Sequence, residues 1–304
     1  MSKAIADARS SDNVVEVTKK YKKRSQLRGI WIRLKRNKAA ILGLMMFLVL
    51  VSAAVFADSI ADYETRVKQI DYMRRLEKPS AEHIFGLDEY GRDIFARIIH
   101  GSRLSLQVGI IAVGVALFVG GSFGAIAGFY GGLIENIIMR SMDILLALPS
   151  ILLAITLMAA LGTSNFNLML AIGLSAVPNY ARIVRSAVLS VKDQEFIEAA
   201  RAVGERNYLI VLSEVLPNCM APIIVQVTLN VATAILSTSS LSFIGLGIQA
   251  PTPEWGNMLA GGRAFLRDAP HLSVFPGIAI AIAILSLNLF GDGLRDALDP
   301  KLKH

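Results

Sequence analysis

Long apolar segments constrain this chain more than any other feature, because about 20 apolar residues is the length that an α-helix needs to cross a bilayer. Six segments are expected to span the membrane, at residues 39–57, 105–129, 137–161, 168–190, 220–246 and 273–290. Inside lipid the backbone polar groups must bond to one another, which a helix achieves within itself. The sequence therefore predicts an all-α integral membrane protein with six transmembrane helices.

Positive charge indicates how these helices are oriented. Residues 19–38 carry ten Lys and Arg, whereas residues 58–77, beyond the first span, carry four. Because Lys and Arg gather on the cytoplasmic side, the N-terminus is expected in the cytoplasm, and six spans return the C-terminus there. Trp31 fits an anchor at the membrane interface. The net charge of +7 is then explained by orientation and anionic lipid, and nucleic acid is not an expected partner.

The spans also predict how the chain is organised. The first 20 residues are expected to be mobile, because they are polar and precede the membrane region. The predicted order is a basic cytoplasmic tail (1–38), a first transmembrane helix (39–57), an external loop with an interfacial elbow (58–104), a five-helix core with a cytoplasmic loop (105–290, the loop at 191–219) and a cytoplasmic C-terminal tail (291–304).

Several classes of chemistry are excluded by what the sequence lacks. No Gly is followed by Lys, so the phosphate-binding motif GxxxxGK[ST] is missing and the chain is expected to bind no ATP itself. The single cysteine, Cys219, excludes an internal disulfide and gives no zinc pattern. The histidines are scattered and are interpreted as ordinary surface or interface residues: His83, His100, His271 and His304. We expect no catalytic residue, cofactor or metal in this chain.

Asp143 is the acid that lies well inside a predicted span. An ion-driven carrier places carboxylates at such positions, so a proton relay through Asp143 is one interpretation. Arg140 lies three residues earlier, one helical turn away, and a charged pair near the cytoplasmic interface is the interpretation that we favour.

The polar segment 193–217 lies in the predicted cytoplasmic loop. Its first part, DQEFIEAARAV, has acids in the first turn of a helix, and Gly204 then ends that helix before a second helical piece and Pro217. Small Ala side chains would let another protein approach closely, with Glu198 and Arg201 as charged edges. A helix this short is marginal alone and needs a partner.

The same segment resembles the EAA signature of ABC importer permeases. The matching positions are Glu198, Ala199, Ala200, Gly204, Leu216 and Pro217. The resemblance implies a coupling helix, with Arg201 on its edge, that binds a separate ATPase subunit holding ATP and Mg. Glu214 departs from the pattern, which favours Ile there, and its partner contact is not assigned. The alternative is an amphipathic loop lying on the lipid headgroups.

A second motif, HIFGLDEYGRDIFARIIHGSRLSLQVG, covers residues 83–109. Gly86 and Gly91 permit turns, Asp93 can cap the following helix, and an apolar face would make the interfacial elbow. The string is similar to the GTDxxGRD…GxRxSL block of the peptide and nickel permeases, with Leu87 in place of Thr. Together with the terminal GDGLRDALDPKL, the likeness covers nearly everything after residue 39.

This resemblance implies a type I ABC importer permease bundle, of the C-type peptide permeases, in a bacterial or archaeal plasma membrane. It also implies a homologous second permease as a heterodimer partner, two ATPase subunits and an external solute-binding protein. Di- or oligopeptides are the expected solutes, and nickel or another small solute is the alternative. An ion-coupled carrier and a membrane scaffold that conducts no solute are alternatives of other classes.

Three further features have candidate roles. Gly120, Gly124 and Gly128 form a small-residue ridge for helix packing. A polar stripe on one helix face either lines a solute path or forms interhelical hydrogen bonds, and both interpretations stay open: Gln226, Asn230, Thr233, Ser237 and Ser240. Trp255, in the external loop 247–272, is interpreted as an aromatic anchor at the membrane surface. Alternatively it contacts the solute-binding protein, together with Asp88 and Arg92 of the first external loop.

Overall fold

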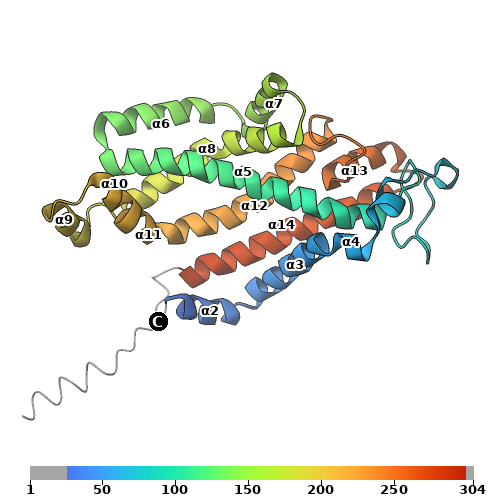
Figure 1. Ribbon diagram of the computed structural model, residues 1–304, viewed down its shortest axis with the longest axis horizontal. Coiled ribbons are helices and arrows are strands. Elements are labelled where there is room, and N and C mark those ends of the chain that lie inside the picture. The colour runs from blue at the N-terminus through green and yellow to red at the C-terminus, as the bar shows by residue number, and fades with distance from the viewer. Residues whose placement is uncertain (1–25, 299–304) are drawn as a thin grey trace, which may run out of the picture.

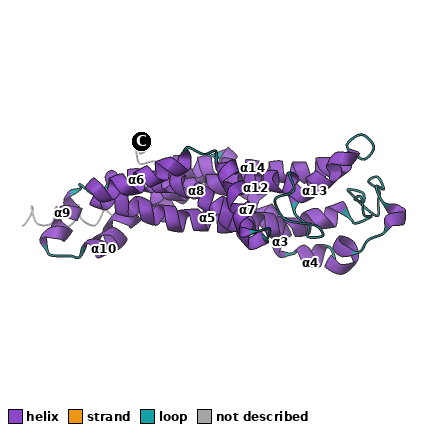
Figure 2. Ribbon diagram, turned by 90° about the horizontal axis from the view of Figure 1, so that it is seen from above, coloured by secondary structure: helices purple, strands orange, loops and turns teal. Residues whose placement is uncertain are grey.

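The computed structural model describes residues 26–298 as an elongated helical bundle (Figure 1). The first 20 residues, which the sequence predicts to be mobile, and His304 both lie outside the described residues. One end of the bundle carries the short helices α9 (Glu195–Ala202) and α10 (Asn207–Leu209), and the opposite end carries α4 (Ala57–Ile60) and α13 (Trp255–Gly262). Figures 1 and 2 show these two ends from perpendicular directions.

Four helices of the described chain are long and apolar enough to cross a membrane: α3 (Lys38–Val55), α5 (Ile94–Tyr130), α12 (Met220–Phe243) and α14 (His271–Leu298). The pair α6 (Gly132–Leu146) and α7 (Ser150–Leu161) adds a fifth if it counts as one span. Helix α8 (Asn165–Leu189) has 25 residues, but it is less apolar than these helices and is not counted among them. The all-α fold is confirmed, and the count of six spans stays a prediction.

The predicted span 137–161 is wrong as a single helix. The structure divides it into α6 and α7, which meet at 90° (Figure 1). Pro149 lies at the break with an extended backbone, φ −54° and ψ 130°. Its ring blocks the carbonyl position four residues earlier and disfavours helical geometry at the preceding residue, so the chain turns there.

Helix α5 is longer than the predicted span 105–129. It begins at Ile94 and continues for 37 residues, so the expected elbow is the first part of the helix itself. At 1.5 Å per residue it measures about 55 Å, well beyond the roughly 30 Å of a hydrocarbon core. One helix therefore runs from the α13 end of the bundle to the α9 end, which are the predicted outer and cytoplasmic ends (Figure 1).

The glycine ridge of α5 packs against α8, as the sequence predicted. A Cβ atom at Gly120 or Gly124 would overlap the carbonyl oxygens of Val177 and Ala181, and one at Gly128 would lie 2.9 Å from Val188. Only a residue without a side chain allows these two backbones to approach so closely.

The predicted tail 1–38 is helical where the structure describes it. Helix α2 (Gln26–Arg36) packs Leu34 against Ala40 and Ala297 beside the end of α14. Asn37 caps α3 by accepting from the backbone N–H of Ala40 at 3.1 Å. Trp31 is exposed with the Lys35 ammonium 5.2 Å from its ring centre, which agrees with a place at the interface.

Short helical pieces connect the long helices. In the two loops predicted to lie outside, called the outer loops below, these are the π-helix η1 (Tyr63–Lys68) and the 3₁₀ turns η2 (Tyr72–Arg74) and η4 (Arg263–Phe265). In the loop predicted to be cytoplasmic, called the cytoplasmic loop below, the π-helix η3 (Ile210–Val215) and α11 (Leu216–Asn218) lead into α12. The expected order of helix, break and helix in residues 193–217 is therefore present.

Candidate functional site

Helix α9 exposes the residues that the EAA resemblance selects. Glu198, Ala199 and Arg201 lie on its exposed surface, and Ala200 is half-buried. The helix ends as predicted, because Gly204 adopts φ +83°, a left-handed conformation that side chains disfavour. No heavy atom lies within 4 Å of a Cβ built at Gly204, so conformation and not crowding selects glycine there.

The inner face of α9 is tied to the bundle. Ile197 is 0% exposed and belongs to a cluster of buried residues from α5, α8 and the cytoplasmic loop: Phe129, Val188, Ile210, Val215 and Cys219. The Arg201 guanidinium lies 5.2 Å from the ring centre of Phe129, at the end of α5. A short helix that is unstable alone is thus held between α5 and η3, and its outer surface stays free.

The end of the cytoplasmic loop is less buried. Leu216 is half-buried and Pro217 exposed, both in α11 just before α12. Glu214 is half-buried, and its backbone carbonyl accepts from Asn218 Nδ2 at 2.6 Å. Within residues 26–298 the Glu214 carboxylate makes no hydrogen bond or ion pair.

Asp143 has a different partner from the one predicted. Its carboxylate pairs with Arg182 of α8 at 2.9 Å, and not with Arg140 on its own helix. A second pair, Glu135 with Arg185, also joins α6 to α8, with Arg185 Nε at 2.6 Å. These two ion pairs hold α6 against α8. The spacing of Arg140 and Asp143 along α6 did not predict the partner of Asp143, because the packing of α8 brings Arg182 closer.

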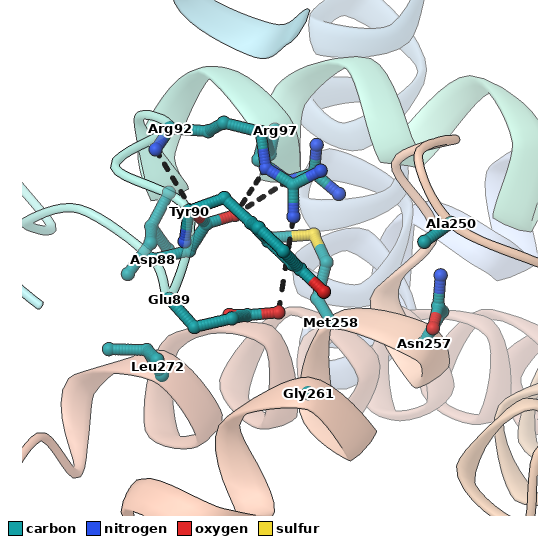
Figure 3. Close-up of a pocket in the computed structure, with 11 residues that line it drawn as sticks. Asp88, Glu89, Tyr90, Arg92, Arg97, Ala250, Asn257, Met258, Gly261 and Leu272 are labelled. Atoms are coloured by element: carbon teal, nitrogen blue, oxygen red, sulfur yellow. Dashed lines mark hydrogen bonds and ion pairs between the residues drawn. The ribbon is translucent and has the colours of Figure 1, made fainter. Parts of the chain in front are cut away.

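The outer loop contains a buried ionic cluster (Figure 3). Asp88 accepts from Arg92 Nε at 2.7 Å and from the backbone N–H groups of Tyr90 and Arg92, each at 2.9 Å. Arg97 lies 3.4 Å from Asp88 and donates to the carbonyl of Pro251 at 3.3 Å, in the second outer loop. Asp88 and Arg92 pair within the first loop and are buried, so they offer no exposed contact surface, and Arg97 joins this loop to the second.

A cavity of about 140 Å³ adjoins this cluster. Asn257, Met258 and Gly261 of α13 form its opposite wall (Figure 3). Burial raises the pKa of Glu89, and the neighbouring Asp88 charge adds to the effect. The first outer loop therefore meets α13 through charged groups that are partly removed from water.

Local sequence explains how the outer loop folds. Gly86 and Gly91 adopt φ of +79° and +78°, and a Cβ at Gly91 would overlap the carbonyl of Asp71. Asp93 caps α5 by accepting from the Ala96 N–H at 3.0 Å. The predicted turns and cap are confirmed.

Two histidines have specific roles, which corrects their interpretation as ordinary surface groups. His83 Nδ1 donates to Asp93 Oδ2 at 2.9 Å. His100 is buried, and its Nε2 donates to the carbonyl of Ala61 at 2.8 Å. Both histidines therefore fasten the first outer loop to the start of α5.

Trp255 is not an interfacial anchor, because its side chain is 0% exposed. Its Nε1 donates to the carbonyl of Ile98 on α5 at 3.0 Å, which fixes α13 to α5. The preceding Glu254 caps α13 by accepting from the N–H groups of Gly256 and Asn257, both at 2.8 Å. Burial raises the pKa of Glu254. Sequence reasoning missed this cap, although an acid directly before a short helix is the usual signal.

The polar stripe of α12 divides between two cavities. Asn230, Thr233 and Ser237 line a cavity of about 100 Å³, and facing them are polar residues of α7 and α8: Ser150, Ser175, Asn179 and Tyr180. Gln226 lines a second cavity of about 390 Å³ with Arg295 of α14. Ser240 lines neither, and its hydroxyl donates to the carbonyl of Leu236 at 2.8 Å.

Both interpretations of the stripe stay predictions. Gln226 Nε2 donates to Asn230 Oδ1 at 3.1 Å, which is a contact within α12 and not between helices, while Asn230, Thr233 and Ser237 line the smaller cavity. Asn179 and Tyr180 were missed by sequence reasoning, because only the packing of α8 beside α12 brings them to this cavity.

Comparisons with known proteins agree with this arrangement. Residues 120–304 match the family model described as "Binding-protein-dependent transport system inner membrane component", and residues 25–79 match "N-terminal TM domain of oligopeptide transport permease C". The inward-facing MetNI methionine ABC transporter has the same fold, with a TM-score of 0.55 and 17% identity over 67% of this chain and 96% of that chain.

Curated relatives are much closer in sequence. A dipeptide transport system permease protein of Alkalihalophilus pseudofirmus is 50% identical over 89% of this chain and 88% of the relative. A di/tripeptide transport system permease protein of Pseudomonas aeruginosa is 43% identical over 92% and 94%, and a glutathione transport system permease protein of Escherichia coli is 42% identical over 96% of both chains. The chain therefore belongs to the family of inner-membrane components of binding-protein-dependent transport systems, as a multi-pass permease subunit of an ABC importer and not an enzyme.

Proposed function

We propose that this permease subunit imports di- or oligopeptides across the plasma membrane. The support for a peptide is that the relatives at 42 to 50% identity are named as permeases for dipeptides, di- and tripeptides and glutathione. The cavity between α8 and α12 is consistent with this solute class, because its polar side chains are uncharged groups able to bond an amide.

The mechanism that we propose is mechanical. Two partner ATPase subunits bind and hydrolyse ATP with Mg, and each permease presents its α9 as the coupling helix. The observation that carries this assignment is the two-sided character of α9, with Glu198 and Arg201 exposed above a fully buried Ile197. A force applied to its exposed face passes into α5 and α8 through the packed cluster beneath, as rigid-body motion requires.

We further propose that a homologous second permease completes the path as a heterodimer, and that an external solute-binding protein meets the outer loops. In this view Asp88 and Arg92 act indirectly. Their buried ion pair fixes the shape of the first outer loop, and Arg97 joins that loop to the one before α13. The surface that the binding protein meets is thus held as one unit.

Uptake by the complete transporter in proteoliposomes tests the proposal. Radiolabelled dipeptide should enter only with ATP, the ATPase subunits and the binding protein present. Glu198→Lys and Gly204→Pro should abolish uptake while the chain still inserts in the membrane, because one reverses the charge of the exposed face and the other removes the left-handed helix end. Normal uptake in both variants would contradict the coupling role of α9. Uptake driven by an ion gradient without the ATPase would instead indicate a secondary carrier.

A further inference from the structure

The cavity between α8 and α12 has an unusual lining for the interior of a membrane bundle. Its polar side chains come from three helices and none of them is charged: Ser150 of α7, Ser175, Asn179 and Tyr180 of α8, and Asn230, Thr233 and Ser237 of α12. Ala112, Val113 and Ile172 complete the wall with apolar surface. Polar groups at this depth are costly unless they face protein, water or a ligand.

One of these groups is poorly bonded. Tyr180 is 0% exposed, and its hydroxyl has no hydrogen bond of normal geometry within the described residues; the side chain of Asn230 is its one weak partner there. A buried hydroxyl without a well-formed hydrogen bond destabilises the fold, and a ligand in the cavity would supply that bond.

The Asn230 amide uses its oxygen within α12. Its Oδ1 accepts from Gln226 Nε2 at 3.1 Å, and its Nδ2 group has only the poorly placed Tyr180 hydroxyl as a further partner in the described chain. The hydroxyls of Ser175 and Thr233 donate to carbonyls of their own helices, at 2.8 Å to Ile172 and 3.4 Å to Leu229. These two hydroxyls therefore face the cavity as acceptors, and Asn230 and Tyr180 supply the donors.

We propose that this cavity is a subsite that binds a main-chain peptide group of the solute, with the Asn230 Nδ2 group and the Tyr180 hydroxyl as its hydrogen-bonding partners. The inference rests on the proposed function, and it adds the site and the chemistry of recognition. A peptide group offers one donor and one acceptor, and the cavity offers both kinds of partner. A volume of about 100 Å³ exceeds what a single water needs.

Because no charged side chain lines the cavity, we can predict which solutes the subsite distinguishes. A charged lining would favour solute side chains of the opposite sign, whereas neutral amide and hydroxyl groups bond equally to the backbone of any peptide. The subsite should therefore contribute similarly to the uptake of acidic, basic and apolar peptides. An amino acid with no peptide bond should gain nothing from it.

The test uses Tyr180→Phe and Asn230→Ala in the complete transporter, reconstituted with its partners in proteoliposomes. Tyr180→Phe keeps the buried ring and removes only the hydroxyl. Thr228→Val is the matched control, because it removes a hydroxyl from α12 at a position outside the cavity lining. The probes are Ala-Ala, Ala-Glu and Ala-Lys, and ATP hydrolysis is measured together with uptake.

Losing one hydrogen bond to the solute should reduce uptake of each dipeptide about three- to tenfold in Tyr180→Phe and in Asn230→Ala. ATP hydrolysis stimulated by the loaded binding protein should stay at the wild-type level, and Thr228→Val should transport normally. Wild-type uptake in both cavity variants, or a loss confined to one peptide charge class, would overturn the subsite. If the wild-type transporter itself takes up no dipeptide with ATP, it is the proposed function that fails.

Discussion

The packing beneath α9 allows a quantitative test of coupling. Ile197 is 0% exposed, and α9 has only eight residues, too few for a stable isolated helix. Its attachment therefore depends on the buried cluster. Truncating a fully buried Ile to Ala costs about 2 to 5 kcal/mol. A value of about 3 kcal/mol in Ile197→Ala would raise the ratio of detached to attached α9 by about 150-fold.

Two measurements on the reconstituted transporter separate the steps of this reasoning. Hydrogen exchange of the α9 amides should accelerate in Ile197→Ala, and peptide uptake per ATP hydrolysed should fall. Val203→Ala is the control, since Val203 follows the same helix but is 83% exposed. Exchange as slow as in the wild type would refute the packing argument. Accelerated exchange with undiminished uptake per ATP would refute the coupling role of α9.

Three further outcomes are expected. Gly124→Ala should lower the melting temperature of the purified protein, because its Cβ would overlap a backbone carbonyl of α8 at a cost of about 1 to 3 kcal/mol, whereas Gly114→Ala, with nothing within 4 Å, should not. Burial raises the pKa of Glu254, so above pH 4.5 the folded protein binds more protons than the unfolded chain. The melting temperature should therefore fall as the pH rises above 4.5, and Glu254→Gln should weaken this dependence on pH. Asp143→Asn should retain ATP-dependent uptake, since an exposed ion pair contributes at most about 1 kcal/mol; abolished uptake would contradict this.

Apolar run length was a good guide to most of the helices. The run at 39–57 appears as Lys38–Val55 and the run at 220–246 as Met220–Phe243, because lipid selects helices of that length. The length of an apolar run does not show, however, whether the chain continues straight or turns within it. Pro149 was visible in the sequence, but its effect on the path of the chain depends on whether neighbouring helices hold a kinked helix straight or let it turn.

The site residues differ in the same way, because some depend on neighbours in the sequence and others on contacts between distant helices. The end of α9 at Gly204 and the cap at Asp93 could be predicted because each depends on a few neighbouring residues. Asp143 pairs with a residue 39 positions away, and Tyr180 meets Asn230 only because α8 packs beside α12. Periodicity within one helix does not encode which helix lies opposite, so these contacts required the structure.

The unbroken course of α5 has a mechanical consequence. Its first turn carries the Asp93 cap and the Arg97 contacts of the outer loops, and its last turn carries Phe129 beneath α9. A rod of about 55 Å that tilts by about 5° displaces one end by about 5 Å relative to the other. Under the proposed coupling role of α9, α5 would act as a lever: a small angular change at its α9 end would move its other end by about the width of a backbone.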